Sequence, residues 1–184
     1  MRSRNRNHFE TINNLYFVTS TIVGFVRVFN EDLYNTFINK LRFYQLRGDY
    51  RLLCYTLMPN HFHLILKTGD TSTVSKCVGN IKRIMSKQIT SYLILKQEAD
   101  LLQLLNQKAT EEPSPDCRIW KPRFDCMVIL KEDILKQKIE YCHWNPVRAG
   151  LVKEPVDWLY SSARNYARQD IILLDVDNEW NCLN

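Results

Sequence analysis

The stretch YTLMPNHFHLILK, residues 55–67, constrains the fold more than any other part of the chain. An apolar run over residues 52–57 stops at the turn 58–60, and a second run begins at once with His61. A connection this short predicts two neighbouring antiparallel strands. Because side chains alternate between the faces of a strand, His61 and His63 are expected on one face. The residues that alternate with them are expected in a core: Phe62, Leu64 and Leu66.

The segment YCHWNP, which begins at Tyr141, is expected to complete a site with the two histidines. Two imidazoles on one strand supply only half of a metal site. A helix over residues 131–144 places Tyr141 and Asn145 one turn apart, on the same face as Lys138. Pro146 is expected to end this helix and to fix the Asn145 amide near its end. A tyrosine hydroxyl beside an amide oxygen suits a nucleophile next to a metal better than it suits a core. The apolar stripe of the same helix is predicted at Leu135, Ile139 and Cys142.

Four segments in chain order, MPNHFHLIL, IWKPRF, YCHWNPVRAGLV and DWLYSSARNY, resemble those of the REP-associated tyrosine transposases. These are single-tyrosine members of the HUH (His-hydrophobic-His) endonucleases, and the resemblance covers residues 16–166. It implies an α+β fold of the ferredoxin-like kind, an antiparallel sheet with the HxH motif on a central strand and helices packed on it. It also implies a partner: single-stranded DNA that carries a hairpin, of the REP-like palindromic kind.

The resemblance implies a catalytic set of Tyr141, His61, His63 and Asn145. Tyr141 would attack the phosphodiester and leave a 5′-phosphotyrosyl link and a free 3′-hydroxyl. A divalent cation held by His61, His63 and Asn145 would polarise the scissile phosphate. Two imidazoles and one amide oxygen suit Mg²⁺, Mn²⁺ or Zn²⁺, and the resemblance favours Mg²⁺ or Mn²⁺. The alternative at each position is structural: an incidental HxH on a strand, and a core tyrosine.

The order of the predicted elements independently indicates a ferredoxin-like α+β unit. Strands are predicted at residues 15–23, 50–57, 61–67 and 127–129, with two further candidates at 147–152 and 171–174. Helices are predicted at 31–47 after an Asn30 cap, from a cap at Thr71 or Thr73 to 93, at 98–107, at 131–144 and at 161–166. A single domain over residues 1–184 is expected, with a basic arm at 1–14, an insertion at 94–117 and an acidic tail at 167–184.

Basic residues and one tryptophan, in several segments, are candidates for contact with DNA. They are Arg2, Arg4 and Arg6 in the arm, Lys82 and Arg83 on the second helix, Trp120, Lys121 and Arg123 in the aromatic-basic turn, and Arg148. Interleaved aromatic and basic side chains can stack on exposed bases and bind phosphates. Each segment also has a simpler interpretation. The arm and the helix face are then merely solvated, and Trp120 and Phe124 are core residues.

Charge and cysteine content agree with a DNA-binding protein of a reducing compartment. No Lys or Arg follows Arg168, whereas four of the 20 acidic residues do, so residues 1–168 carry 25 basic groups against 16 acidic ones. That excess suits a polyanionic partner. The six cysteines form no CxxC pair, which favours free thiols and a cytoplasmic protein. With DNA as its partner, such a protein is expected to be nucleoid-associated. No membrane segment is expected, and both a monomer and a homodimer are compatible with the sequence.

Two rival functions remain open at this level. The first is a domesticated protein that binds DNA hairpins without cutting them. The second is a metal-dependent oxygenase or hydrolase that uses the same two histidines. Such an enzyme ordinarily needs a carboxylate as third ligand, and Asp70 is the only acidic residue that closely follows the motif.

Overall fold

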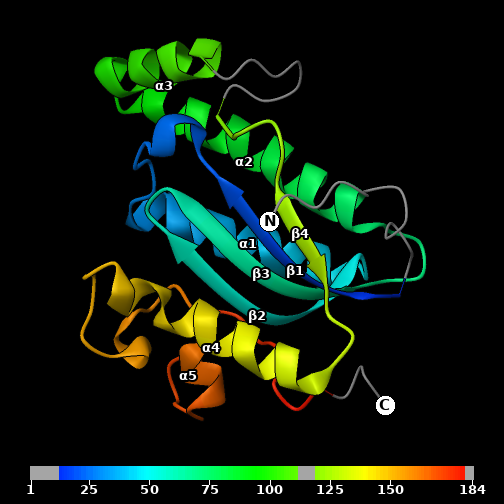
Figure 1. Ribbon diagram of the computed structural model, residues 1–184. Coiled ribbons are helices and arrows are strands. Elements are labelled where there is room, and N and C mark those ends of the chain that lie inside the picture. Colours follow the sequence, from blue (N-terminus) through cyan, green and yellow to red (C-terminus); the bar gives the residue numbers. More distant parts are fainter. Residues whose placement is uncertain (1–12, 112–118, 181–184) are drawn as a thin grey trace.

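Four strands form one antiparallel sheet in the order β2-β3-β1-β4 in the computed structural model (Figure 1). The structure describes residues 13–111 and 119–180, so Arg2, Arg4 and Arg6 lie outside the described part. The strands are β1 (Leu15–Thr21), β2 (Tyr50–Met58), β3 (His61–Thr68) and β4 (Asp125–Val128). The helices are α1 (Glu31–Leu46), α2 (Val74–Leu95), α3 (Ala99–Glu111), α4 (Glu132–Arg148) and α5 (Ala163–Tyr166), with single 3₁₀ turns η2 (Val23–Phe25) and η3 (Pro155–Asp157).

This order of elements and strands is the ferredoxin-like arrangement, so the predicted fold class is confirmed. The strand with the two histidines, β3, lies between β2 and β1 in the middle of the sheet. In the register of the ladder, Thr21 and Thr19 of β1 face His61 and His63. On the other side of β3, Met58 and Thr56 of β2 face the same two histidines.

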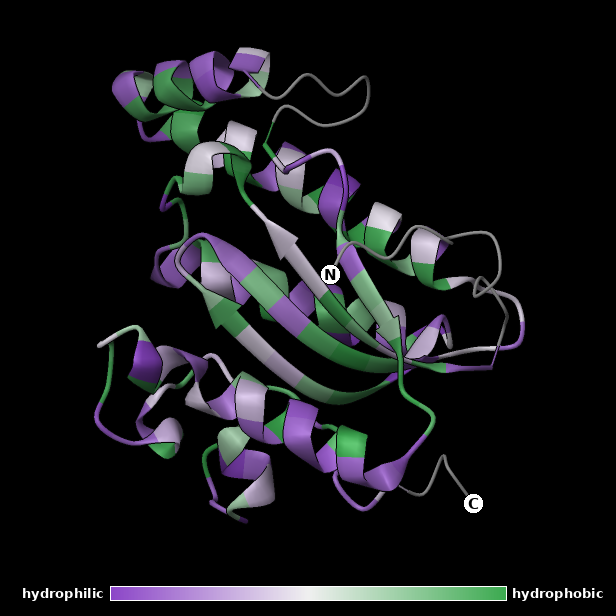
Figure 2. Cartoon of the chain, in the orientation of Figure 1, coloured by the Kyte–Doolittle hydropathy of each residue, from purple (hydrophilic) through white to green (hydrophobic). Residues whose placement is uncertain are grey.

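Helices cover both faces of the sheet, and the alternation along β3 assigns each residue to one of them (Figure 1). Phe62, Leu64 and Leu66 pack against α1 and α2 in the larger core. Ile65 packs on the other face against α4, whose predicted apolar stripe is buried there: Leu135, Ile139 and Cys142. The side of α4 that faces the viewer in Figure 2 is mostly hydrophilic, as expected for a helix with one face on the core.

The predicted helix caps are formed. The Asn30 side chain accepts a hydrogen bond from the Leu33 amide at 3.1 Å, and Thr73 accepts one from Lys76 at 3.3 Å. Gly48, with φ of +80°, follows α1 in the left-handed conformation that terminates helices.

The prediction that Pro146 ends the last long helix is wrong, because α4 continues to Arg148. A proline inside a helix leaves the carbonyl four residues earlier without its amide partner. Here that carbonyl belongs to Cys142, and the buried Thr56 hydroxyl of β2 donates to it at 3.0 Å. The helix ends at Arg148 instead, followed by Gly150 with φ of +68°, and the Leu151 amide donates to the Pro146 carbonyl at 2.9 Å. No strand forms over the candidate range 147–152.

The candidate strand at 171–174 is also absent, because this segment bonds to side chains rather than to a ladder. Arg42 donates to the Leu173 carbonyl, and Gln45 donates to the Asp175 carbonyl at 3.1 Å. The Leu174 side chain is buried in the larger core. The segment therefore continues the packing around α1.

The predicted insertion at 94–117 contains α3, which packs on α2 and η2, and its residues 112–117 lie outside the described part. Leu105 of α3 is fully buried in the larger core. Among the described residues, no helix is long and apolar enough to cross a bilayer.

Candidate active site

Three of the predicted site residues come together on the α4 face of the sheet. The ring centroids of His61 and His63 lie 4.9 Å apart at an angle of 81°. The Tyr141 ring, from α4, lies 5.4 Å from the His63 ring at 76°. Phe17 of β1 stacks on the His63 ring at 5.7 Å and meets the edge of Tyr141 at 5.9 Å, so one aromatic side chain fixes the position of both.

His63 is the deeper of the two histidines, with 2% of its surface exposed. Its Nδ1 lies 2.7 Å from the Thr19 hydroxyl, whereas its buried Nε2 has no hydrogen-bond partner within the described residues. Burial lowers the pKa of His63 to about 3, aided by the positive charges of His61 and Lys138 and opposed by hydrogen bonding to Asn145. His63 is therefore neutral at pH 7, which is the form that ligates metals.

The protonation of His61 is fixed by its neighbour Asn60. The Asn60 side-chain oxygen lies 2.7 Å from His61 Nδ1, and its nitrogen donates to the Phe25 carbonyl at 2.9 Å. A carbonyl can only accept, so the amide nitrogen must face Phe25 and the amide oxygen must face the ring. The proton of neutral His61 then sits on Nδ1, and the lone pair of Nε2 is left for a ligand.

Asn145, one turn after Tyr141, completes the set. Its side chain acts on the pKa of both histidines in the raising direction, but burial outweighs this effect and keeps the pKa of both below the usual value. This amide does not satisfy His63 Nε2, which stays without a partner among the described residues. Two imidazole rings and an amide side chain therefore come together, and one ring has a buried nitrogen that a bound cation would satisfy.

Among the described residues, no carboxylate joins the two histidines in a metal-binding group. Within residues 13–111 and 119–180, no three side chains of His, Cys, Asp or Glu form a group that could hold a metal. Asp70 follows the far end of β3 from His61, at a distance of roughly 25–30 Å for an extended strand of this length. Asp70 is therefore too far away to serve as the third ligand that the oxygenase and hydrolase alternatives require.

Tyr141 is accessible and has two cations close to its ring. Its side chain is 40% exposed. The Lys138 ammonium lies 5.6 Å from the centre of its ring, and the Arg148 guanidinium carbon lies 5.5 Å from it. Arg148 also donates to the Tyr141 carbonyl at 3.5 Å. A phosphate that approaches Tyr141 would thus meet positive charge from two side chains.

Two of the predicted DNA contacts are wrong, because their side chains are used inside the protein. Trp120 is fully buried among three phenylalanine rings, and its indole nitrogen donates to the Lys82 carbonyl at 3.1 Å. The Lys82 ammonium is 5% exposed and donates to the Lys121 carbonyl at 2.8 Å. Both residues fasten the aromatic-basic turn to α2, so neither can stack on a base or reach a phosphate from this position.

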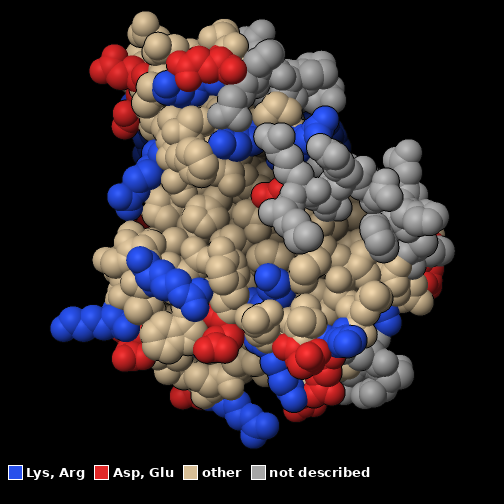
Figure 3. Space-filling view, in the orientation of Figure 1, with Lys and Arg blue, Asp and Glu red and all other residues tan. Residues whose placement is uncertain are grey.

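The remaining candidates keep a surface that DNA could contact. Arg83, Arg123 and Arg148 are exposed, and Lys121 is partly buried. Figure 3 shows Lys and Arg scattered over this face of the molecule, with acidic groups gathered at the top over α3 and near the bottom. The distribution of charge therefore does not by itself define a DNA-binding surface. Lys138 and Arg148, beside Tyr141, indicate its position more specifically.

His143 has a structural role. Its Nε2 lies 2.9 Å from the Ser162 hydroxyl and 3.4 Å from the Cys54 sulfur. The Ser162 hydroxyl lies 3.3 Å from the same sulfur. This buried cluster joins α4 to β2 and to the start of α5.

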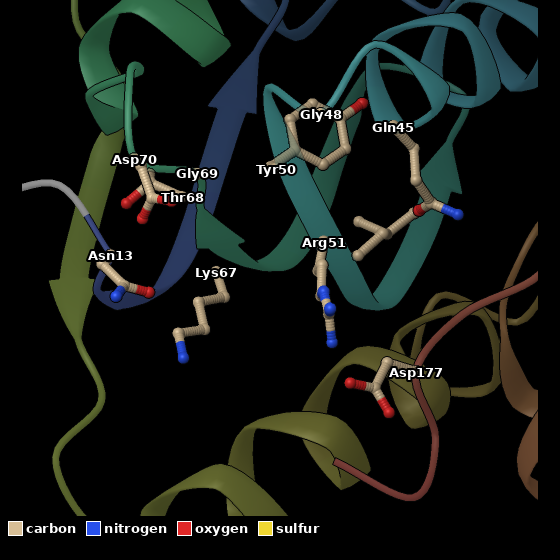
Figure 4. Close-up of a pocket in the computed structure, with 11 residues that line it drawn as sticks. Asn13, Gln45, Gly48, Tyr50, Arg51, Lys67, Thr68, Gly69, Asp70 and Asp177 are labelled. Carbon is tan, nitrogen blue, oxygen red and sulfur yellow. The ribbon is translucent and has the colours of Figure 1, made fainter. Parts of the chain in front are cut away.

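A cavity of about 710 Å³ lies at the opposite end of β2 and β3 from the histidines (Figure 4). Arg51 and Lys67, which face each other across the two strands, point toward it, and Asp177 lies across from Arg51. Its lining mixes both charges, and none of the site residues described above belongs to it.

Comparisons with known proteins point to one family. Residues 25–107 match the family described as "Transposase IS200 like". A Haemophilus influenzae protein assigned as a REP-associated tyrosine transposase is 23% identical over 162 residues, which are 88% of this chain and 86% of that protein. The resemblance to the REP-associated tyrosine transposases is confirmed. A solved REP-associated tyrosine transposase bound to a REP hairpin has the same fold, with a TM-score of 0.61 at 18% identity over 97% of this chain and 93% of that one.

The family match has a boundary that matters for the site. It includes the HxH strand but ends before α4, so it does not reach Tyr141 or Asn145. The roles of these two residues rest on the geometry above and on the motif resemblance.

Sequence reasoning missed Thr19 and Asn60, whose contacts with the histidines orient both rings. Asn60 was detectable as the residue before the motif, whereas Thr19 becomes visible only through the register of β1 on β3.

The contact between Thr19 and His63 has a measurable consequence. Thr19→Val keeps the shape of the side chain and removes the hydroxyl, so the His63 ring loses the partner of its Nδ1. Loss of such a partner typically lowers metal affinity about 10- to 100-fold. We expect that loss in a calorimetric titration with Mn²⁺, and near-normal affinity for Thr19→Ser. Equal affinities of the valine variant and the unchanged protein would show that Thr19 does not orient the ring.

Proposed function

We propose that this protein is a metal-dependent single-strand DNA endonuclease and strand transferase that acts on hairpin DNA through a 5′-phosphotyrosyl intermediate on Tyr141. One observation carries the proposal. The accessible Tyr141 lies against neutral His63, which is paired with His61 and has a buried Nε2 with no partner among the described residues.

The residues present fit a divalent cation. His61, His63 and Asn145 would hold Mg²⁺ or Mn²⁺ through two ring nitrogens and one amide oxygen. When bound, the cation supplies Lewis acidity that polarises the scissile phosphate and offsets charge in the transition state. Asn60 keeps the His61 ring in the tautomer that this role requires, and the Thr19 hydroxyl, 2.7 Å from Nδ1, orients the His63 ring.

The covalent step belongs to Tyr141. Its phenolic oxygen attacks the phosphorus and loses its proton, the new tyrosyl O–P bond forms, and the bond from phosphorus to the 3′-oxygen breaks. The leaving 3′-oxygen takes up a proton and becomes a free hydroxyl. Because the phosphotyrosyl link conserves the energy of the broken bond, transfer to another 3′-hydroxyl needs no nucleotide cofactor. Lys138 and Arg148 stand beside the ring and bind the phosphate that is being exchanged.

Hairpin DNA is the proposed substrate because of the relatives this chain resembles. The solved relative is bound to a REP hairpin, and the chain aligns with it over nearly its whole length. The binding-only alternative shares this partner but has no use for Tyr141 or for the unpartnered His63 nitrogen. We propose one catalytic tyrosine per chain, in a single domain that acts as a monomer or a homodimer.

The substrate form can be tested directly. Single-stranded DNA that carries a short palindrome from the flanks of its own gene should bind far better than the same sequence as a perfect duplex. Unpaired bases offer stacking surfaces that a duplex hides. The measurement is a competition gel shift at one fixed salt concentration, because phosphate contacts make both affinities salt-dependent. Equal affinity for the duplex would contradict the proposed substrate, and binding without any cleavage in Mn²⁺ would favour the binding-only alternative.

A further inference from the structure

Phe25 is an exposed aromatic residue in a strained backbone conformation. It lies at the end of η2, directly after the strand that pairs with the HxH strand, and 61% of its side chain is exposed. Its φ is +56°, in the left-handed region that residues other than glycine seldom adopt. With most of the ring exposed, burial of apolar surface offsets little of this strain. Strained residues concentrate at functional sites, where the surrounding structure holds them in place.

The surrounding structure holds Phe25 from two sides. Its amide donates to the Ile22 carbonyl at 3.1 Å, and its carbonyl accepts from Asn60 at 2.9 Å. The same Asn60 side chain holds His61, so a single amide links the Phe25 backbone to the HxH motif. On the other side α3 packs against the turn so closely that a Cβ at Gly24 would lie 2.6 Å from Lys108 Cγ.

A cation lies over the ring. The Lys121 ammonium is 3.9 Å from the centre of the Phe25 ring. The Lys121 backbone is itself fixed, because its amide donates to the Thr21 carbonyl at 2.8 Å and its carbonyl accepts from the buried Lys82 ammonium. Trp120, next to Lys121 in the sequence, is buried, and the aromatic ring beneath this ammonium is that of Phe25.

We infer that Phe25 and Lys121 form a binding site for one unpaired nucleotide of the DNA strand next to the hairpin. This inference rests on the proposed function and adds a contact that is independent of the metal and of Tyr141. The Phe25 ring stacks on the base, and the Lys121 ammonium binds the adjoining phosphate. The link through Asn60 keeps this nucleotide at a fixed position relative to His61, so α3 and the strained turn help to select where the strand is cut.

The decisive variant is Phe25→Gly, which removes the ring and also relieves the strain at φ of +56°. The folded protein should therefore be at least as stable as the unchanged one, and a melting curve checks this. Phe43→Leu is the matched control, because Phe43 is 54% exposed and also carries a cation, Arg47, at 5.6 Å, but sits in α1. Phe25→Trp keeps a stacking surface.

The affinities are measured without metal on two oligonucleotides, a hairpin with an unpaired flank and the same hairpin without it. Loss of one stacked base corresponds to about 5- to 150-fold in affinity. Phe25→Gly should show that loss only on the flanked hairpin, while Phe25→Trp and Phe43→Leu bind both normally. An equal loss on both hairpins, or no loss on either, would overturn the inference. If the unchanged protein binds neither hairpin, the proposed function fails first.

Discussion

Tyr141→Phe should abolish the covalent adduct with DNA while leaving the fold and hairpin binding intact. Incubation of the unchanged protein with Mg²⁺ and a labelled hairpin strand is expected to yield an SDS-resistant adduct that carries the fragment 3′ of the cut. The variant lacks only the attacking oxygen, so cleavage should fall on the order of 10³-fold or more. Because the Tyr141 side chain is 40% exposed, the free energy of unfolding should change by no more than about 0.5 kcal/mol.

A second tyrosine provides the control for this experiment. Tyr92 of α2 is partly exposed, and its hydroxyl accepts a hydrogen bond from Asn30 at 2.9 Å, far in the fold from the histidines. Tyr92→Phe should form the adduct at the normal rate. An adduct that persists in Tyr141→Phe would place the nucleophile elsewhere and contradict the orientation of α4 described above. No adduct with the unchanged protein on any hairpin from its own genome would support a protein that binds without cutting.

The parts of the site that were predictable from the sequence are those set by local periodicity. Alternation along β3 is enough to place His61 and His63 on one face, and the three- and four-residue steps of α4 are enough to orient Tyr141 and Asn145. Both follow from the geometry of a single element. The tight turn before His61 also fixes the pairing of β2 with β3, which is a property of neighbouring residues.

The parts that were not predictable depend on contacts between distant segments. Trp120 has the same neighbours in sequence whether it faces DNA or the core, and only its packing against Phe29, Phe37 and Phe62 decides the matter. The end of α4 was misplaced for a similar reason. A proline is tolerated there because Thr56, 90 positions earlier in the chain, satisfies the carbonyl that the proline leaves free.

Removal of the histidines should separate metal binding from DNA binding. His61→Ala, His63→Ala and the double variant are expected to lose Mn²⁺ affinity in a calorimetric titration, and cleavage should fall by about 100-fold or more with it. Hairpin binding without metal should stay within about 2-fold, because its main contribution comes from Lys and Arg contacts with phosphates. Unchanged Mn²⁺ affinity in the double variant would exclude this site as the metal site.

The same variants give a readout that requires no DNA. A ligand that binds only the folded state stabilises it by about 2.7 kcal/mol at a concentration of 100 times its Kd. Mn²⁺ should therefore raise the melting temperature of the unchanged protein, because it satisfies the buried His63 nitrogen that otherwise has no partner among the described residues. It should not raise that of His61→Ala or His63→Ala. His143→Ala is the control, since His143 bonds to Ser162 and Cys54 instead. That variant should melt at a lower temperature and still respond to Mn²⁺, which distinguishes a histidine that holds the fold together from two that hold the metal.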